Sequence, residues 1–257
     1  MSFLTLEGIH HTYFSKTSVT TAIDEVSLAV EEGEFVSFLG PSGCGKTTLL
    51  SIIAGLLMPT CGKAAINGKT VQRPDGEIGY MLQQDYLFPW KTIAENIFLG
   101  LKTMNKLNED TKERSLRLLE DMGLGNVEQQ YPDELSGGMR QRVALVRTLA
   151  VNPKLLLLDE PFSALDYQTK LKLEDLVLAT LKEYNKTALL VTHDIGEAIA
   201  MSDRIYLLKG EPGAIARIFE VPAELRNKRP FLARQDERFS ALFQTIWKEL
   251  ESLEQTS

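Results

Sequence analysis

Short apolar runs alternate along the chain with longer segments in which apolar residues recur at helical spacing. The runs 34–39, 155–158 and 187–192 have few polar interruptions, a pattern typical of parallel strands covered on both faces. A further strand is expected at 77–82. Helical spacing predicts helices over 47–57, 93–101, 109–122, 140–151, 168–184 and 195–201. The alternation predicts an α/β fold with a mostly parallel sheet.

The remaining strand signals lie near the two ends of the chain. Residues 3–38 are β-rich, and a hairpin is predicted over 63–71. A second strand pair is expected at 204–209 and 214–219. Residues 86–152 are mainly helical, so this stretch is predicted to be a helical insertion between two core strands. Within the β-rich part, the strand-like runs are 3–6, 23–30 and 35–39.

The C-terminal segment carries an amphipathic pattern over four helical turns. A helix of this kind either packs back on its own domain or binds a partner, and the first is the commoner case. We therefore expect the segment 231–257 to be an amphipathic helix that follows a larger domain at 3–230. Its apolar positions are Phe239, Leu242, Phe243, Ile246, Trp247, Leu250 and Leu253.

Composition limits the class of protein. The 257 residues are 44% hydrophobic and 25% charged, as in ordinary globular proteins. Their net charge of −7 argues against a surface that coats nucleic acid. The apolar stretch 47–60 is too short to span a bilayer, and we see no secretory signal, so the chain is expected to be cytosolic and to reach a membrane only by docking. The two cysteines, Cys44 and Cys61, are expected to be free thiols.

One turn carries a complete phosphate-binding pattern. Residues 40–47 fit G-x-x-x-x-G-K-[ST] between a predicted strand and a predicted helix. In such a turn glycines let backbone N–H groups surround an anion, and the helix N-terminus adds partial positive charge. Lys46 is expected to bridge the β- and γ-phosphates, and the Thr47 hydroxyl to ligate Mg²⁺. The eight residues are Gly40, Pro41, Ser42, Gly43, Cys44, Gly45, Lys46 and Thr47.

Polar residues follow several of the predicted strands. Asp159 could hold Mg²⁺ directly or through water, and Glu160 could orient and deprotonate an attacking water. His193 could donate to the γ-phosphate, and Gln83 could reach both metal and water. These four residues should meet at the carboxyl edge of the sheet, where open α/β folds bind ligands. The combination predicts nucleotide hydrolysis.

Residues 135–139, Leu-Ser-Gly-Gly-Met, resemble the signature of ABC-type ATPases, with Met139 in place of the usual Gln. The family's other motifs match in order. Residues 40–47 resemble Walker A, Gln83 the Q-loop, 155–159 Walker B, Glu160 the catalytic base, 163–166 the D-loop, and His193 the H-loop. The resemblance implies a P-loop NTPase core with an N-terminal antiparallel β subdomain and an inserted α-helical subdomain at about 86–152.

The resemblance also implies which aromatic residue stacks on adenine and which glutamine forms the Q-loop. Tyr13 stands where the family stacks an aromatic side chain on adenine, and Phe14 beside it is the alternative. Gln83 is preferred over Gln84 for the Q-loop because it lies six residues before the pair formed by Pro89 and Trp90.

The resemblance implies that two copies pair head to tail and share each nucleotide. ATP, with Mg²⁺, is expected to lie between residues 40–48 of one copy and Ser136, Gly137 and Gly138 of the other. Thr48 and Asp166 belong to the same nucleotide-binding set. The physics agrees, since a hydroxyl, two small residues and a helix N-terminus suit a phosphate.

Within the family, residues 88–90 and the Arg-rich stretch before Phe239 resemble ATPase subunits of bacterial importers for nitrate, sulfonates and taurine. Trp90 has a second interpretation as a buried anchor of the helical insertion. We expect an ATPase subunit on the cytoplasmic face of the cell membrane, bound to permease subunits, served indirectly by an extracytoplasmic binding protein, and without a nucleic-acid partner. The alternative is an ABC-type ATPase that acts on nucleic acid or ribosomes.

Overall fold

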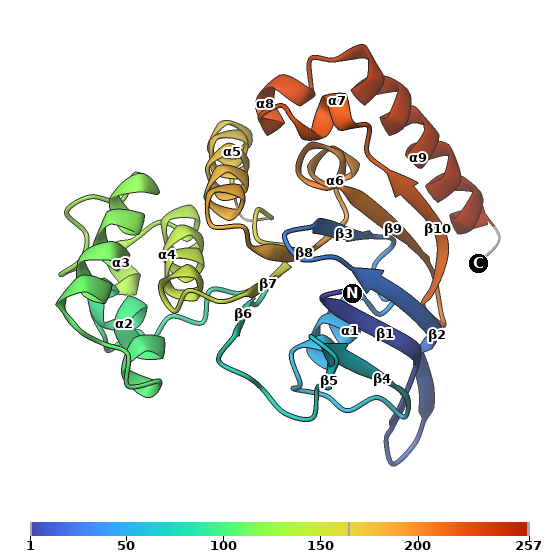
Figure 1. Ribbon diagram of the computed structural model, residues 1–257, viewed down its shortest axis with the longest axis horizontal. Coiled ribbons are helices and arrows are strands. Elements are labelled where there is room, and N and C mark those ends of the chain that lie inside the picture. Colours follow the sequence, from blue (N-terminus) through green and yellow to red (C-terminus); the bar gives the residue numbers. More distant parts are fainter. Residues whose placement is uncertain (1, 164, 256–257) are drawn as a thin grey trace.

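A six-stranded sheet forms the centre of the computed structural model, which describes residues 2–163 and 165–255 (Figure 1). Its strand order is β10-β9-β3-β8-β7-β6, and all neighbours are parallel except β10 and β9. The predicted α/β fold with a mostly parallel sheet is therefore confirmed. The strands are β3 (Phe35–Leu39), β6 (Ile78–Met81), β7 (Leu155–Asp159), β8 (Thr187–Thr192), β9 (Arg204–Lys209) and β10 (Ala214–Glu220).

The inner strands of this sheet are covered on both faces. Every residue of β3, β7 and β8 is buried. Because side chains alternate along a strand, Leu155 and Leu157 enter one apolar cluster while Leu156 and Leu158 enter the other. The first cluster includes residues of α1 (Lys46–Ile53), and the second includes residues of α5 (Tyr167–Glu183) and α6 (Ile195–Met201).

A second, antiparallel sheet covers the α1 side with strand order β2-β1-β4-β5. Its strands β1 and β2 are longer than the predicted runs 3–6 and 23–30, because register shifts near Leu6, Ile9 and His11 break the alternation that the sequence pattern relies on. The predicted hairpin is confirmed as β4 and β5, which turn at Asn67 and Gly68. The bounds are β1 (Leu4–Phe14), β2 (Val19–Val30), β4 (Cys61–Ile66) and β5 (Lys69–Thr70).

Helix α1 ends at Ile53, four residues before the predicted end. Gly55 has φ 71°, and a Cβ at this position would lie 2.4 Å from the carbonyl of Arg73. A glycine in the left-handed conformation ends a helix. The apolar residues after Gly55 therefore continue the helical spacing in the sequence without being helical.

The stretch between β6 and β7 forms a helical lobe beside the sheet (Figure 1). Helix α4 packs against α2, α3 and β6. Capping boxes start α2 at Thr92 and α3 at Asn108. The elements are α2 (Ile93–Thr103), α3 (Glu109–Asp121), the 3₁₀ turn η1 (Pro132–Glu134) and α4 (Gly137–Ala150).

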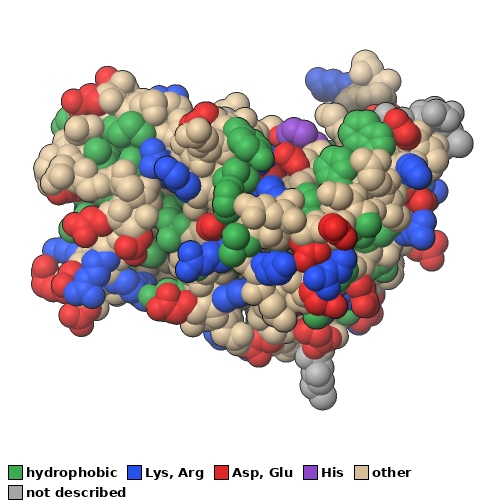
Figure 2. Space-filling model, turned by 90° about the horizontal axis from the view of Figure 1, so that it is seen from above, with side chains coloured by type: hydrophobic (Ala, Val, Ile, Leu, Met, Phe, Trp, Pro, Cys, Tyr) green, Lys and Arg blue, Asp and Glu red, His purple; other side chains and the backbone are tan. Residues whose placement is uncertain are grey.

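The C-terminal segment packs over α5 and α6, so the predicted packing of the tail on its own body is confirmed. It forms α7 (Ala223–Arg226), α8 (Pro230–Ala233) and α9 (Glu237–Gln255), and residues 256 and 257 lie outside the described part. The division of the chain at residue 230 stays a prediction. Apolar side chains are also visible on this side of the molecule (Figure 2). The exposed ones on α5, α8 and α9 are Tyr167, Phe231, Leu232 and Trp247.

A buried ion pair anchors the tail. Glu174 of α5 is 0% exposed, and its Oε2 lies 2.6 Å from Nη1 of Arg234, directly after α8. Burial raises the pKa of Glu174 to about 7, although Arg234 opposes the shift.

In the described part of the chain, no helix is both long and apolar enough to cross a membrane.

Replacing Arg234 with Met should destabilise the protein by about 3–5 kcal/mol, because it leaves the Glu174 carboxylate buried without its cation. The folded pKa of Glu174 lies above its unfolded value, so this group's contribution to stability falls as pH rises through about 7. The loss should therefore be larger above about pH 7 than below about pH 5. Urea unfolding at both pH values measures it. The control is Arg217→Met, which breaks the exposed pair with Glu249; an equal loss in both variants would contradict the prediction.

Candidate functional site

The phosphate loop connects β3 to α1 and depends on two left-handed glycines. Gly43 has φ 84° and Gly45 has φ 82°. A Cβ on Gly45 would lie 2.4 Å from Cδ1 of Ile23 and 2.7 Å from the carbonyl oxygen of Ala22. Only glycine satisfies both the backbone conformation and the space at this position.

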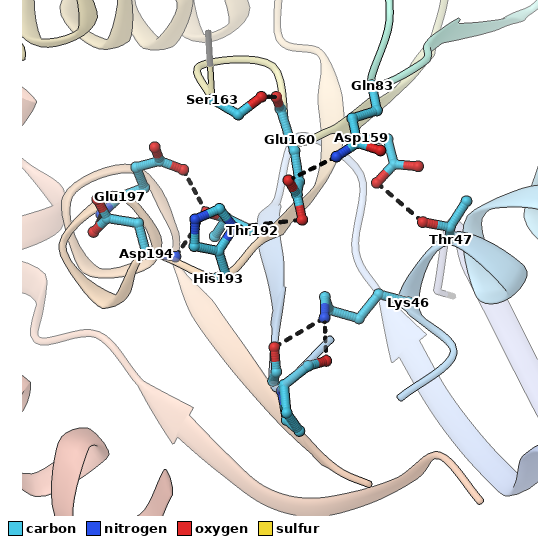
Figure 3. A network of polar contacts seen from close by, with 12 residues as sticks. Lys46, Thr47, Gln83, Asp159, Glu160, Ser163, Thr192, His193, Asp194 and Glu197 are labelled. Atoms are coloured by element: carbon cyan, nitrogen blue, oxygen red, sulfur yellow. Dashed lines mark hydrogen bonds and ion pairs between the residues drawn. The ribbon is translucent and has the colours of Figure 1, made fainter. Parts of the chain in front are cut away.

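The loop presents donors to its interior. Within residues 2–163 and 165–255, no acceptor is recorded for the N–H groups of Gly45, Thr47 and Thr48, while the backbone N–H of Lys46 bonds the Cys44 thiol. Free N–H groups at a helix N-terminus attract anions. Nζ of Lys46 donates to the carbonyl oxygens of Gly40 at 2.9 Å and Pro41 at 2.7 Å (Figure 3). The geometry therefore fits a phosphate group.

Cys44 and Ser42, two further residues of the phosphate loop, differ in the exposure of their side chains. Cys44 is buried beneath the loop, 3.6 Å from Nζ of Lys46, and burial raises the pKa of its thiol. Ser42 is exposed. Cys44 thus fills space under the loop, while Ser42 faces outward.

The end of β7 brings a carboxylate to the start of α1. Thr47 Oγ1 donates to Asp159 Oδ1 at 3.3 Å (Figure 3). Asp159 is 3% exposed, and burial raises its pKa against the hydrogen bond from Thr47 and the charge of Lys46. The Thr47 hydroxyl and the Asp159 carboxylate place two oxygen ligands side by side, and burial makes the negative charge on Asp159 costly. Both features suit a small divalent cation such as Mg²⁺.

Tyr80 is a neighbour that the sequence patterns missed. Burial and the nearby Asp159 carboxylate raise the pKa of Tyr80 to about 12. Its strand, β6, pairs with β7, and this pairing rather than any motif places it under Asp159.

Two of the expected residues, Gln83 and His193, contact the carboxylate of Glu160 (Figure 3). Gln83 Nε2 donates to Glu160 Oε2 at 3.0 Å, and Nδ1 of His193 lies 3.4 Å from Glu160 Oε1. Gln83 therefore contacts Glu160 here, not the pair formed by Thr47 and Asp159. No such contact is recorded for Gln84.

Glu160 adopts an unusual backbone conformation. Its φ is 47°, and its N–H donates to the carbonyl of Val191 on β8 at 2.9 Å. The Ser163 hydroxyl donates to the Glu160 carbonyl at 2.9 Å. A left-handed non-glycine residue costs of the order of 1–3 kcal/mol, and such strain is concentrated at functional sites. The strain directs the carboxylate toward Gln83 and His193.

The signature residues lie apart from this group. Ser136 caps α4 by accepting from the N–H of Met139 at 3.4 Å, and Ser136 and Gly137 are exposed. A Cβ on Gly138 would lie 3.0 Å from Leu165. Helix α4 belongs to the helical lobe, whereas α1 lies on the far side of the sheet (Figure 1). One chain therefore leaves the signature away from its own phosphate loop.

The D-loop is described except for Ala164, which lies outside the described residues. Asp166 caps α5 by accepting from the N–H of Thr169 at 3.1 Å, and this hydrogen bond lowers the pKa of Asp166. Asp166 is exposed, so it is available to a ligand or a partner.

Of the two aromatic candidates for adenine, Tyr13 lies nearer the phosphate loop. Its hydroxyl is 3.2 Å from Oγ1 of Thr48, and its ring meets His11 edge to face at 4.5 Å. Among residues 2–163 and 165–255, no ring stacking is recorded for Phe14, which is 73% exposed. The geometry favours Tyr13.

The interpretation of Trp90 as a buried anchor is wrong, because this side chain is 70% exposed. Its ring packs only on Phe88, at 5.3 Å, in the described part of the chain. Asn96, which is fully buried, anchors the loop instead. Its amide bonds the backbone of Phe88 in both directions and the carbonyls of Lys91 and Thr92.

The family model described as ABC transporter matches residues 23–163. The chain belongs to the ABC transporter ATP-binding proteins. An uncharacterized member from Bacillus subtilis strain 168, YtlC, is 63% identical over 99% of this chain and 98% of the relative. The aliphatic sulfonates import ATP-binding protein SsuB 1 of Rhodococcus jostii strain RHA1 is 46% identical over 85% of this chain and 83% of the relative.

A solved ABC cassette has the same fold. The cassette MJ0796, described as a dimer in a post-hydrolysis state with ADP and phosphate, matches with a TM-score of 0.76 and 34% identity, over 86% of this chain and 99% of the solved chain. The P-loop core with its antiparallel β subdomain is thus confirmed, as is the similarity to sulfonate, nitrate and taurine importer ATPases. This ABC ATPase binds and hydrolyses ATP.

Replacing Gly45 with Ala should weaken ATP binding by this ABC ATPase by about tenfold or more. The added methyl group meets Ile23 and Ala22, and the left-handed backbone alone costs an L-residue about 1–2 kcal/mol. Titration with a fluorescent ATP analogue gives the Kd. Gly68→Ala is the matched control, since φ is 73° there but no atom lies within 4 Å of the new Cβ. Equal, wild-type affinity in both variants would show that the loop does not need its glycine.

Proposed function

We propose that this ABC ATPase energises a membrane importer for a small anionic solute by ATP-driven closure of a dimer. The observation that carries the proposal is the division of the site: the phosphate loop, Asp159, Glu160 and His193 gather at one sheet edge, while Ser136 lies apart on α4. Similarity to a sulfonate importer ATPase supports the transport role.

In the proposed binding mode, Tyr13 stacks on adenine and residues 40–48 enclose the phosphates. Lys46 exchanges its bonds to the carbonyls of Gly40 and Pro41 for bonds to the β- and γ-phosphates. Thr47, Asp159 and Gln83 hold Mg²⁺ directly or through water. When bound, the ion neutralises phosphate charge as the terminal bond breaks.

In the proposed hydrolysis step, Glu160 orients the attacking water and accepts its proton. Gln83 and His193 already contact this carboxylate, so both are close enough to help place the water. His193 is exposed beside Glu160 and donates to the γ-phosphate in the transition state. A carboxylate repels phosphate, so Glu160 acts on the water and not on ATP itself.

A second copy completes the site in this proposal. Its Ser136, Gly137 and Gly138 cover the γ-phosphate with a hydroxyl and a helix N-terminus, and its Asp166 approaches from the loop before α5. The solved relative MJ0796 is described as a dimer, which supports this arrangement.

Mixing two inactive variants tests the shared site. Lys46→Ala removes a phosphate ligand, and Gly137→Asp places a carboxylate at the signature, where a Cβ would meet only the flexible end of Arg140 at 3.8 Å, so the fold should tolerate it. Each alone should be inactive. Mixed, they should regain roughly a quarter of wild-type ATPase activity, because half of the pairs are mixed and each mixed pair holds one intact site.

The control mixes Lys46→Ala with a chain that carries both substitutions, a combination that contains no intact site in any pairing. Recovery in the first mixture alone supports a site shared between two chains. No recovery in either mixture indicates a site completed within one chain.

The membrane partner is proposed to dock on residues 82–90. Leu82, Tyr86 and Trp90 are exposed there, and Asn96 holds the loop from beneath. Such exposed apolar side chains on a fixed loop are typical of an interaction site. The loop begins directly before Gln83, so a permease subunit bound there senses the nucleotide site. In this proposal the chain lies on the cytoplasmic face of the membrane, and its link to an extracytoplasmic binding protein runs through the permease.

The solute class rests on the relatives and on the sequence resemblance. A sulfonate importer relative at 46% identity, together with residues 88–90, points to a small anion such as a sulfonate, nitrate or taurine. The net charge of −7 gives no support to a nucleic-acid partner.

The decisive experiment uses Glu160→Gln in the assembled complex. Turnover should fall about 10²–10⁴-fold, since the substitution removes the base, while ATP binding stays. Capture from membranes should recover an integral membrane protein with both wild type and variant, and only wild type should drive uptake of an aliphatic sulfonate into vesicles. The control is Glu183→Gln, at an exposed position of α5. Recovery of ribosomes or nucleic acid instead would favour the alternative, and wild-type turnover in Glu160→Gln would remove the base assignment.

A further inference from the structure

A group of charged side chains lies directly behind the loop that carries His193. Lys170, on the first turns of α5, has a side chain that is 14% exposed. Its Nζ lies 2.6 Å from Asp194 Oδ2 and 2.5 Å from Glu197 Oε1. One ammonium group thus joins two carboxylates at the start of α6.

The same two carboxylates hold the residues on either side of His193 (Figure 3). Thr192 Oγ1 donates to Glu197 Oε2 at 2.5 Å and accepts the Asp194 N–H at 3.0 Å. The N–H of Glu197 donates to Asp194 Oδ1 at 3.1 Å. The backbone before and after His193 is therefore tied into one closed set of hydrogen bonds.

The charge balance of this set depends on Lys170. Burial disfavours the charged form of Lys170, but the two carboxylates outweigh burial and raise its pKa. Burial likewise acts to raise the pKa of Asp194, but Lys170 outweighs it and lowers the pKa. In the described part of the chain, every ion pair recorded for Asp194 and Glu197 is with Lys170. Without it, two close carboxylates would repel each other, and Glu197, whose side chain is only 5% exposed, would be left with little screening by water.

Another nearby cation is already engaged. Arg234 pairs with the fully buried Glu174. It therefore has its own carboxylate to neutralise, and the position of Asp194 and Glu197 rests on Lys170.

We propose that Lys170 is a positioning residue for ATP hydrolysis: by bridging Asp194 and Glu197, it holds His193 against Glu160. His193 Nδ1 lies 3.4 Å from Glu160 Oε1, and a small shift of the loop would break this contact. Lys170 is also fixed to the D-loop, because its N–H donates to the carbonyl of Asp166 at 2.9 Å. The inference rests on the role proposed above for His193.

The test compares Lys170→Met with Lys170→Arg in the purified full chain. Lys170→Met should lower kcat roughly 10–100-fold, because small misplacements of catalytic groups have effects of this size, with the KM for ATP within about twofold. Lys170→Arg keeps a cation between the carboxylates and should retain most of kcat. Lys172→Met, exposed on the same helix, is the matched control and should be unchanged. Lys170→Gln serves in place of Met if that variant does not fold, with the same expected loss.

A charge-compensating variant separates positioning from general damage. In Lys170→Met with Asp194→Asn, the asparagine keeps the cap of α6 but removes one of the two repelling charges, so kcat should recover several-fold. Wild-type kcat in Lys170→Met would overturn the inference. So would a loss that Lys170→Arg shares and Asp194→Asn does not relieve.

The variant His193→Ala distinguishes a failure of the positioning role of Lys170 from a failure of the proposed role of His193. An inactive His193→Ala beside an active Lys170→Met removes only the positioning role. Wild-type turnover in His193→Ala removes the proposed function of His193 and, with it, the role of Lys170.

Discussion

Complete burial of β3, β7 and β8 is the constraint on which the site depends. A strand covered on both faces has no room for a charge along its length, because an unpaired buried charge is very costly. Charged groups can then appear only where the strands end, whereas a small polar group such as the Ser37 hydroxyl is tolerated inside β3 because it bonds the Ser202 hydroxyl. Parallel strands end at one edge, so Lys46, Asp159 and His193, which are far apart in sequence, come together there. Burial of the strands thus confines the charged side chains to the edge of the sheet where the site forms.

Two side chains at this edge, Lys46 and Thr47, have internal partners that a nucleotide can replace. Lys46 donates to two carbonyl oxygens, and Thr47 donates to Asp159. Such exchange keeps these two side chains satisfied and lowers the net cost of binding, since neither has to be stripped of water alone. Glu160 differs, because its backbone strain is maintained by hydrogen bonds to β8 and to the turn after it. The position of Glu160, the proposed base, is thus set by the sheet and not by the ligand.

Sequence reasoning succeeded where structure follows local pattern. The run 187–192 and the helix 195–201 match β8 and α6 residue for residue, because burial and helical period are read directly from neighbouring residues. It failed where a single backbone position decides: Gly55 ends α1 early, and shifts near Leu6 and Ile9 extend β1. It also missed Lys170, whose partners are 24 and 27 positions away and meet it only after α5 packs beside α6. The exposure of Trp90 was misjudged because aromatic content alone does not say which face of a loop is covered.

The position of α6 joins the tail to the nucleotide site. Asp194 caps this helix at its N-terminus, and α8 and α9 of the tail pack against it. A hollow of about 410 Å³ is lined jointly by Gly40, Pro41 and His193 and by Phe243 and Trp247 of α9. Packed interiors transmit displacements because they have few voids to absorb them. The tail helix therefore shares one wall with the phosphate loop and also packs against the helix that follows His193, so the tail and the nucleotide site are parts of one packed unit.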